Sequence, residues 1–239
     1  MVKQTLRKLR IVEIPKEFKS LHLDSKTIDY NYKYEVIRKL IHLNSLSIPI
    51  IYYYIDKQLA LTILIPLTFA FLVVDVVRYY NPQVADWFYR FFGFLLRKKE
   101  RDDRKKRLNG ATNVLLSALF CVIVFPKLIF VTAFSILIIS DISSALIGRK
   151  FGRRKFFAKS LEGSAAFFIS AVIVIFFTPK VEHHFLEYVI GFIAAFFGTI
   201  AESMSFEIDD NLSIPITIGT VMWILYALLL PQINVYYFG

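Results

Sequence analysis

The sequence predicts an all-α integral membrane protein with about seven transmembrane helices and a cytoplasmic N-terminus. Three observations lead to this prediction. Hydrophobic residues make up 56% of the 239 residues, and the mean hydropathy is +0.53, which is more apolar than an ordinary soluble domain. Long apolar runs recur along the chain, and positive charge is concentrated in alternate connections between them.

Seven apolar runs are the candidate spans, since a span needs roughly 20 residues and about 17 at the least. They cover residues 41–55, 59–77, 111–125, 128–146, 161–178, 185–201 and 214–230. Runs 41–55 and 111–125 reach that length only with a few flanking residues. A further apolar stretch at 84–96 is too short to span, so we expect it to lie at the membrane interface.

The distribution of basic residues gives the orientation. All but three of the 29 Lys and Arg residues lie in residues 1–40, 78–110 and 148–160. By the positive-inside rule these segments are cytoplasmic. The net charge of +10 then mainly reflects the basic residues that mark the cytoplasmic segments, and we expect no nucleic-acid partner. Residues 1–33 are expected to form a basic cytoplasmic extension before one membrane-embedded domain at 34–239.

The most informative motif places Asp209, Asp210 and Asn211 between two apolar runs. The connection before the last expected span contains no Lys or Arg, but it also carries Glu202 and Glu207. Carboxylates close to the hydrocarbon core are expensive and are functional candidates by default. Their natural partner is a hard cation such as Mg²⁺, which takes oxygen ligands and usually carries a phosphate. The motif therefore predicts a site for a metal and a nucleotide.

A second candidate begins at Asp141, which interrupts an otherwise apolar run. Gly148 and Arg149 follow about two helical turns later. Backbone N–H groups and guanidinium groups of this segment could contact phosphates. The alternative interpretation is a basic anchor with a glycine at the end of the helix.

Lys159 and Ser160 open the next apolar run, followed by Glu162 and Gly163. Helix N-termini favour anions, Ser160 is a suitable cap, and Lys159 adds a point charge for a phosphate. The alternative is an ordinary capped helix start, which Glu162 in the first turn fits equally well.

Accessory candidates lie at the cytoplasmic ends of three expected spans. Arg38 and His42 share one helix face at the i, i+4 spacing, whereas Asp75 and Arg78 are expected to pair at i, i+3. The full set is Arg38, Lys39, His42, Asp75, Arg78, Gly110 and Thr112. The chain lacks a Gly-x-x-x-x-Gly-Lys-Ser/Thr loop, so it is not a P-loop enzyme.

Taken in order, these motifs resemble the family of CTP-dependent lipid-alcohol kinases, which comprises dolichol kinase, phytol kinase and the yeast-type diacylglycerol kinase. The matching segments are residues 35–42, 75–78, 108–112, 141–149, 159–163, Glu202 and 209–215. The resemblance covers about residues 34–230. It implies CTP as the phosphate donor, Mg²⁺ as the cofactor, and a membrane lipid alcohol as the acceptor at the cytoplasmic interface.

The resemblance also assigns roles to the candidate residues. Mg²⁺ would be held by Asp209 and Asp210, together with Glu202 and Asp141. The catalytic residues would be Asp209, Asp210 and Glu202, with Asp210 as the acceptor of the substrate proton. The nucleotide and its phosphates would contact Gly148, Arg149, Lys159, Ser160, Glu162, Gly163 and Asn211. The protein would be integral to the cell membrane of a prokaryote or the endoplasmic reticulum of a eukaryote.

Two alternatives remain. Phosphatidate cytidylyltransferases, which make CDP-lipids, share the region from Asp141 to Gly163, but their later signature is Asp-Arg-x-Asp-Ser. This chain instead has Asp209-Asp210-Asn211-Leu212, which favours the kinase branch. An ion-coupled transporter would use Asp141 and Glu202 as ion ligands. Such a carrier usually places these residues near the midplane between inverted repeats, and the sequence shows no repeat.

Overall fold

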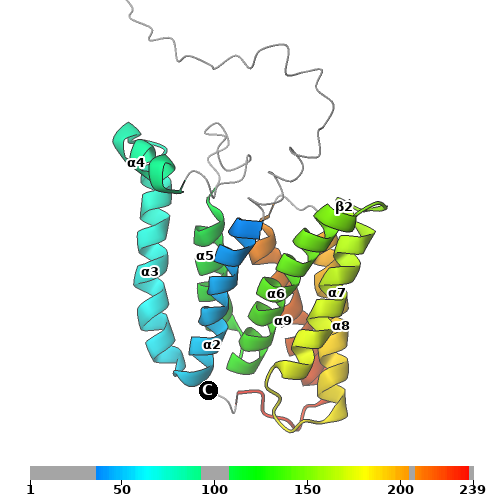
Figure 1. The fold of residues 1–239 in the computed structure, drawn as a ribbon. Helices are drawn as coiled ribbons and strands as arrows, with labels where there is room; N and C mark the ends of the chain where they lie inside the picture. The colour runs from blue at the N-terminus through cyan, green and yellow to red at the C-terminus, as the bar shows by residue number, and fades with distance from the viewer. Residues whose placement is uncertain (1–35, 93–107, 205–207, 237–239) are drawn as a thin grey trace, which may run out of the picture.

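The computed structural model describes residues 36–92, 108–204 and 208–236 as a bundle of helices (Figure 1). The expected cytoplasmic extension at 1–33, much of the basic connection after residue 92 and Glu207 lie outside the described residues. Residues 36–43 are helical and continue through η2 (Asn44–Leu46) into α2 (Ser47–Tyr54). The elements that follow are α3 (Lys57–Val77), α4 (Pro82–Phe92), α5 (Gly110–Val124), α6 (Lys127–Phe151), β1 (Lys155–Phe156), β2 (Lys159–Ser160), α7 (Leu161–Phe177), α8 (Phe185–Ser203) and α9 (Asp210–Leu229).

Each of the seven apolar runs contains helix, as the sequence predicts. Helices α3, α6, α8 and α9 are long and apolar enough to cross a membrane, whereas α5 and α7 are shorter apolar helices. The expected class, an all-α membrane protein, therefore agrees with the structure. The count of seven spans and the cytoplasmic N-terminus stay predictions. Most of the expected interfacial segment forms the short helix α4.

Helix α6 lies at the centre of the bundle and packs against α2, α7 and α9. In its most apolar window α6 is 72% buried, compared with 22% for α3, which packs on α5 at the edge. The rings of Phe130 and Phe134 stack at 4.8 Å on α6, and Tyr52 of α2 meets Phe130 edge-on at 5.0 Å. Asp141 on α6 is therefore buried inside the protein rather than facing lipid.

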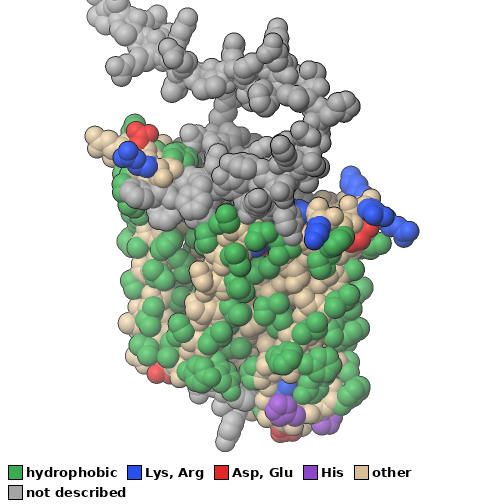
Figure 2. All heavy atoms as spheres, viewed as in Figure 1, with side chains coloured by type: hydrophobic (Ala, Val, Ile, Leu, Met, Phe, Trp, Pro, Cys, Tyr) green, Lys and Arg blue, Asp and Glu red, His purple; other side chains and the backbone are tan. Residues whose placement is uncertain are grey.

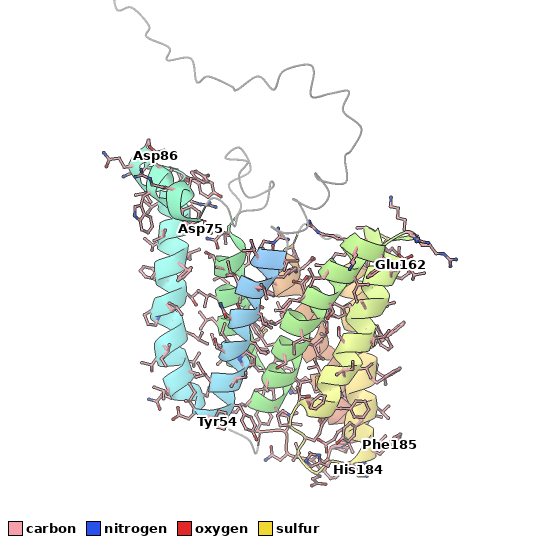
Figure 3. The ribbon with its side chains drawn as sticks, viewed as in Figure 1. Tyr54, Asp75, Asp86, Glu162, His184 and Phe185 are labelled. Carbon is pink, nitrogen blue, oxygen red and sulfur yellow. The ribbon has the colours of Figure 1, made fainter. Side chains whose placement is uncertain are left out.

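Charged side chains gather at the two ends of the bundle, and hydrophobic side chains cover the middle of the visible face (Figure 2). Figure 3 places Asp75 and Glu162 at one end, and Tyr54 and His184 at the other. We call the end with Asp75 and Glu162 the site end. This distribution is the one expected for a bundle surrounded by hydrocarbon, since ionised groups stay near water.

An antiparallel pair of short strands follows α6, where the sequence indicated only a basic loop. Phe157 in its turn has a φ of 48°, in the left-handed region that non-glycine residues rarely adopt. The N–H of Ala158 donates to the carbonyl of Ser203 at 3.1 Å, which docks the hairpin on the end of α8. The hairpin thereby brings Lys159 to the end of α8.

The arrangement of the helix ends predicts the outcome of cysteine labelling. Cys121 is the only cysteine and is buried, so it can be replaced before single cysteines are introduced. Lys155→Cys and Ile208→Cys, both exposed at the site end, should react with a membrane-impermeant maleimide from the same side of the membrane. Glu182→Cys should react from the other side. Labelling of positions 155 and 208 from opposite sides would contradict the arrangement.

Candidate active site

The buried carboxylate of Glu202 is the centre of a polar cluster at the site end. It belongs to the last turn of α8, rather than to the connection in which the sequence analysis placed it, and it has no exposed surface. Lys159 donates to its Oε1 at 2.7 Å, Ser144 donates to the same oxygen at 2.5 Å, and Ser164 donates to Oε2 at 3.4 Å. Elements α6, α7, α8 and β2 therefore meet at one carboxylate.

Lys159 also reaches Asp210, the first residue of α9, with its Nζ 3.0 Å from Oδ2. Burial disfavours the charged ammonium, but the carboxylates of Asp210 and Glu202 outweigh burial and raise the pKa of Lys159 above its ordinary value. Lys159 is therefore a cation throughout the physiological pH range. Two carboxylates from different helices converge on one positive centre.

Close packing of α6 and α7 supports this cluster from behind. A Cβ on Gly163 would lie 3.1 Å from both the Cα of Gly148 and the carbonyl oxygen of Ser144. Larger residues at these two positions would separate the helices and move Ser144 and Ser164 away from Glu202. Gly148 and Gly163 therefore act through packing in this structure.

The start of α7 confirms the expected cap and revises the expected role of the hairpin backbone. Ser160 accepts a hydrogen bond from the N–H of Gly163 at 3.2 Å. The carboxylate of Glu162 accepts from the N–H groups of Arg153 and Arg154, at 3.0 and 3.3 Å. These backbone donors are already used, so a phosphate at this place would be contacted mainly by side chains such as that of Lys159. Arg149, in the last turn of α6, is exposed.

Asp209 caps α9 and orients Asn211. Its Oδ1 accepts from the backbone N–H of Asn211 at 3.0 Å and from the side-chain Nδ2 at 2.7 Å. Asn211 is buried, while Asp209 and Asp210 are partly exposed. The first turn of α9 thus presents Asp210 to Lys159 and turns Asn211 into the protein.

Asp141 has a different set of partners from the one expected. It forms a short hydrogen-bonded ion pair with Lys39, and Nε2 of His42 lies 3.7 Å from the same oxygen. Both partners come from the helical residues 36–43. Asp141 thus ties this segment to α6, and it does not join Glu202 and Asp210 on Lys159.

A cavity of about 460 Å³ opens beside Asp141. Its polar lining includes Arg38, Lys39, His42, Asp141 and Asn211, and most of the remaining walls are apolar side chains from α3, α4 and α5. Gly110, another accessory candidate, also lines it. Six candidates from the sequence therefore line one cavity, although they come from four separate segments.

Asp75 and Arg78 form the expected pair, with Arg78 Nε 2.7 Å from Asp75 Oδ1. Asp75 also accepts from the N–H of Asn109 at 2.7 Å, and Asn109 in turn caps α5 by accepting from the N–H of Thr112 at 3.0 Å. The pair therefore joins α3 to the start of α5. Both residues are buried, and their role in this structure is to position the walls of the cavity.

The donor set at Lys159 fits a magnesium ion in its chemistry. No group of three or more His, Cys, Asp or Glu side chains that could hold a metal occurs within the described ranges 36–92, 108–204 and 208–236. Mg²⁺ is, however, commonly held by only one or two carboxylates and by the phosphates of its substrate. Glu202 and Asp210 supply two such carboxylates, because both lie within 3.0 Å of the same ammonium.

Ser144 and Ser164 were missed by the sequence analysis. Their hydroxyl groups satisfy the buried Glu202, but serines in apolar helices commonly bond to their own backbone and give no distinct signal. The one available hint is that Ser144 lies three residues after Asp141, and so on a similar face of the helix.

Replacing Glu202 by Gln tests the polar cluster. The amide keeps the shape of the side chain but removes the negative charge to which Lys159, Ser144 and Ser164 donate hydrogen bonds. We expect a loss of about 1–3 kcal/mol in the free energy of unfolding, measured as a lower melting temperature in detergent. Glu182→Gln, an exposed change at the other end of the bundle, is the matched control. Equal melting temperatures for Glu202→Gln and the unmodified protein would contradict the described contacts.

Comparison with known proteins adds three relatives. An uncharacterized protein of Rickettsia prowazekii is 31% identical over 194 residues, which cover 80% of this chain and 94% of that protein. The CTP-dependent diacylglycerol kinase 1 of Saccharomyces cerevisiae is 32% identical over 151 residues, covering 61% of this chain and 50% of the yeast enzyme. The enzyme of the same name from Schizosaccharomyces pombe is 27% identical over 169 residues, covering 63% and 74%.

The chain thus spans about half the length of the Saccharomyces cerevisiae enzyme that it matches. No family model and no solved structure matches the chain. The similarity to CTP-dependent diacylglycerol kinases is distant, whereas the match to the Rickettsia protein extends over most of both chains. The chain therefore belongs to the family of the Rickettsia prowazekii protein and is a distant relative of CTP-dependent diacylglycerol kinases.

Proposed function

We propose that this protein is a CTP-dependent kinase that phosphorylates the hydroxyl of a membrane lipid alcohol, with its active site at the cytoplasmic side. The observation that carries the proposal is the convergence of Glu202 and Asp210 on Lys159 at one end of an apolar bundle. Phosphoryl transfer requires charge neutralisation and positioning more than covalent chemistry, and this cluster supplies both signs of charge. The distant similarity to CTP-dependent diacylglycerol kinases supports the same class of reaction.

Glu202 and Asp210 would hold Mg²⁺, with Asp209 within reach at the adjoining position. Mg²⁺ neutralises charge on the phosphates when it is bound. Asp141, which the sequence analysis grouped with the metal ligands, is paired with Lys39 and stands outside this proposed set. Lys159 would then turn from the carboxylates toward the phosphates, since its side chain is 30% exposed and has a path to solvent.

The reaction moves one phosphoryl group. The lipid hydroxyl oxygen forms a bond to the γ-phosphorus of CTP, and the bond from that phosphorus to the β–γ bridging oxygen breaks. CDP leaves with the bridging oxygen, and the hydroxyl proton passes to a carboxylate, which we assign to Asp210. Lys159, which lies 3.0 Å from Asp210, would release that carboxylate to accept the proton when it turns toward the phosphates.

CTP labelled at different phosphates tests the proposed reaction. With purified protein, Mg²⁺ and a panel of diacylglycerol, phytol, polyprenol and phosphatidate in mixed micelles, the γ label should appear in one lipid alcohol and the α label in CDP. Asp210→Asn should reduce turnover at least about a hundredfold, with Glu182→Gln as the matched control. Appearance of only the α label in lipid would overturn the kinase and establish a cytidylyltransferase. Near-normal turnover of Asp210→Asn would remove Asp210 from the mechanism.

A further inference from the structure

The cavity beside Asp141 has most of its walls from elements that play no part in the Lys159 cluster. Its apolar walls come from α3, α4 and α5, and include Phe71, Val74, Trp87, Ala111 and Val114. A volume of about 460 Å³ is within the ordinary range of small-molecule sites, roughly 300–1,000 Å³. Such a site combines apolar walls with a few polar groups that fix the orientation of the ligand. Here the charged and titratable groups lie on the side formed by α6 and residues 36–43, together with Asn211 of α9.

The polar side of the cavity adjoins the proposed transfer site through two short connections. Asn211 lines the cavity and is the direct neighbour of Asp210 in the first turn of α9. Asp141 lines it too, and lies one helical turn before Ser144, whose hydroxyl donates to Glu202. A hydroxyl group held between Asp141 and Asn211 is therefore next to the carboxylates that face Lys159.

The apolar side of the cavity adjoins the lipid-facing surface of the bundle. Ala70 and Phe71 of α3 and Ile41 of the first helical segment line the cavity, and all three are exposed. Leu40, next to Ile41, is 59% exposed. In a bilayer these residues would face hydrocarbon, because exposed apolar side chains on a membrane-spanning bundle lie against lipid. A membrane lipid can thus reach the cavity sideways, without its tail crossing the polar interface.

We infer that this cavity is the acceptor subsite, which holds the hydroxyl end of a neutral lipid alcohol. The hydroxyl lies between Asp141 and Asn211, and the adjoining carbon atoms pack against Phe71, Val74 and Trp87. The rest of the lipid's hydrocarbon remains in the bilayer. The inference rests on the proposed lipid kinase activity, and it adds the place of the lipid. It also means that Asp141 positions the acceptor hydroxyl and does not bind the metal.

Filling the cavity from its lipid-facing side separates lipid binding from nucleotide binding. Ala70→Phe and Ala111→Phe each place a ring where the first carbon atoms of the lipid would pack. Loss of about two buried methylene groups predicts an increase of about tenfold in the mole fraction of lipid that gives half-maximal rate. The half-saturating CTP concentration should stay within about twofold. Ala165→Phe, the same change at an exposed alanine near the start of α7, is the matched control.

Photolabelling of the unmodified protein provides the second measurement, which does not depend on the folding of a variant. Diacylglycerol with a diazirine close to its glycerol should label peptides of α3 or α5 at the cavity, and excess unlabelled lipid should compete. Label found elsewhere would overturn the assignment. So would an equal mole fraction of lipid at half-maximal rate in Ala70→Phe, Ala111→Phe and Ala165→Phe. A changed CTP requirement with an unchanged lipid requirement would do so as well, because it would make the cavity a nucleotide site.

The two proposals can fail separately. If the γ label enters lipid but both cavity variants behave as the control does, the kinase remains and the acceptor subsite is wrong. If the cavity is photolabelled competitively while no phosphate reaches any lipid, the cavity is a lipid site and the kinase is wrong.

Discussion

The buried carboxylate of Glu202 is the constraint on which the site end of the molecule depends. Removing a charge from water in a membrane protein is tolerated only when other groups compensate for it. The compensation comes from three elements that are distant in sequence: Ser144 on α6, Ser164 on α7 and Lys159 on β2. Lys159 then extends the network to Asp210 on α9. One carboxylate therefore fixes the mutual placement of four helices and a hairpin, and it does so where a phosphate donor would bind.

The same contacts explain why this end can serve both stability and chemistry. Without a nucleotide, the positive charge of Lys159 balances two carboxylates that would otherwise repel each other. With a magnesium nucleotide, the metal can take over that balance and Lys159 can turn to the phosphates, so no charge is left uncompensated. One turn earlier on α6, the pair of Lys39 and Asp141 keeps the first helical segment against the bundle and bounds the cavity beside it. The proposed donor and acceptor sites are thus adjacent but are built from different residues.

Local patterns in the sequence predicted the parts of this arrangement that depend on neighbouring residues. The apolar runs gave the helices, Ser160 its cap on α7, and the i, i+3 spacing the pair of Asp75 and Arg78. The contact between Lys159 and Glu202 joins residues 43 positions apart. It depends on a hairpin in whose turn Phe157 has a left-handed backbone conformation. Neither feature has a local signal. The expectation that Asp141 shares a metal with Asp210 came from the family resemblance and stays a prediction. Its ion pair with Lys39 depends on the packing of residues 36–43, which has no local signal in the sequence.

Equilibrium binding of CTP, with and without Mg²⁺, tests most directly whether the cluster of Lys159, Glu202 and Asp210 is the nucleotide site. The account predicts that Mg²⁺ strengthens CTP binding to the purified protein at least about tenfold. Replacing Lys159 by Met should weaken the binding of CTP with Mg²⁺ by a similar factor, and Glu202→Gln should reduce the effect of Mg²⁺, whereas Lys155→Met, an exposed change on the same hairpin, should do neither. CTP binding of equal strength in the unmodified protein, Lys159→Met and Glu202→Gln, independent of Mg²⁺, would contradict the account.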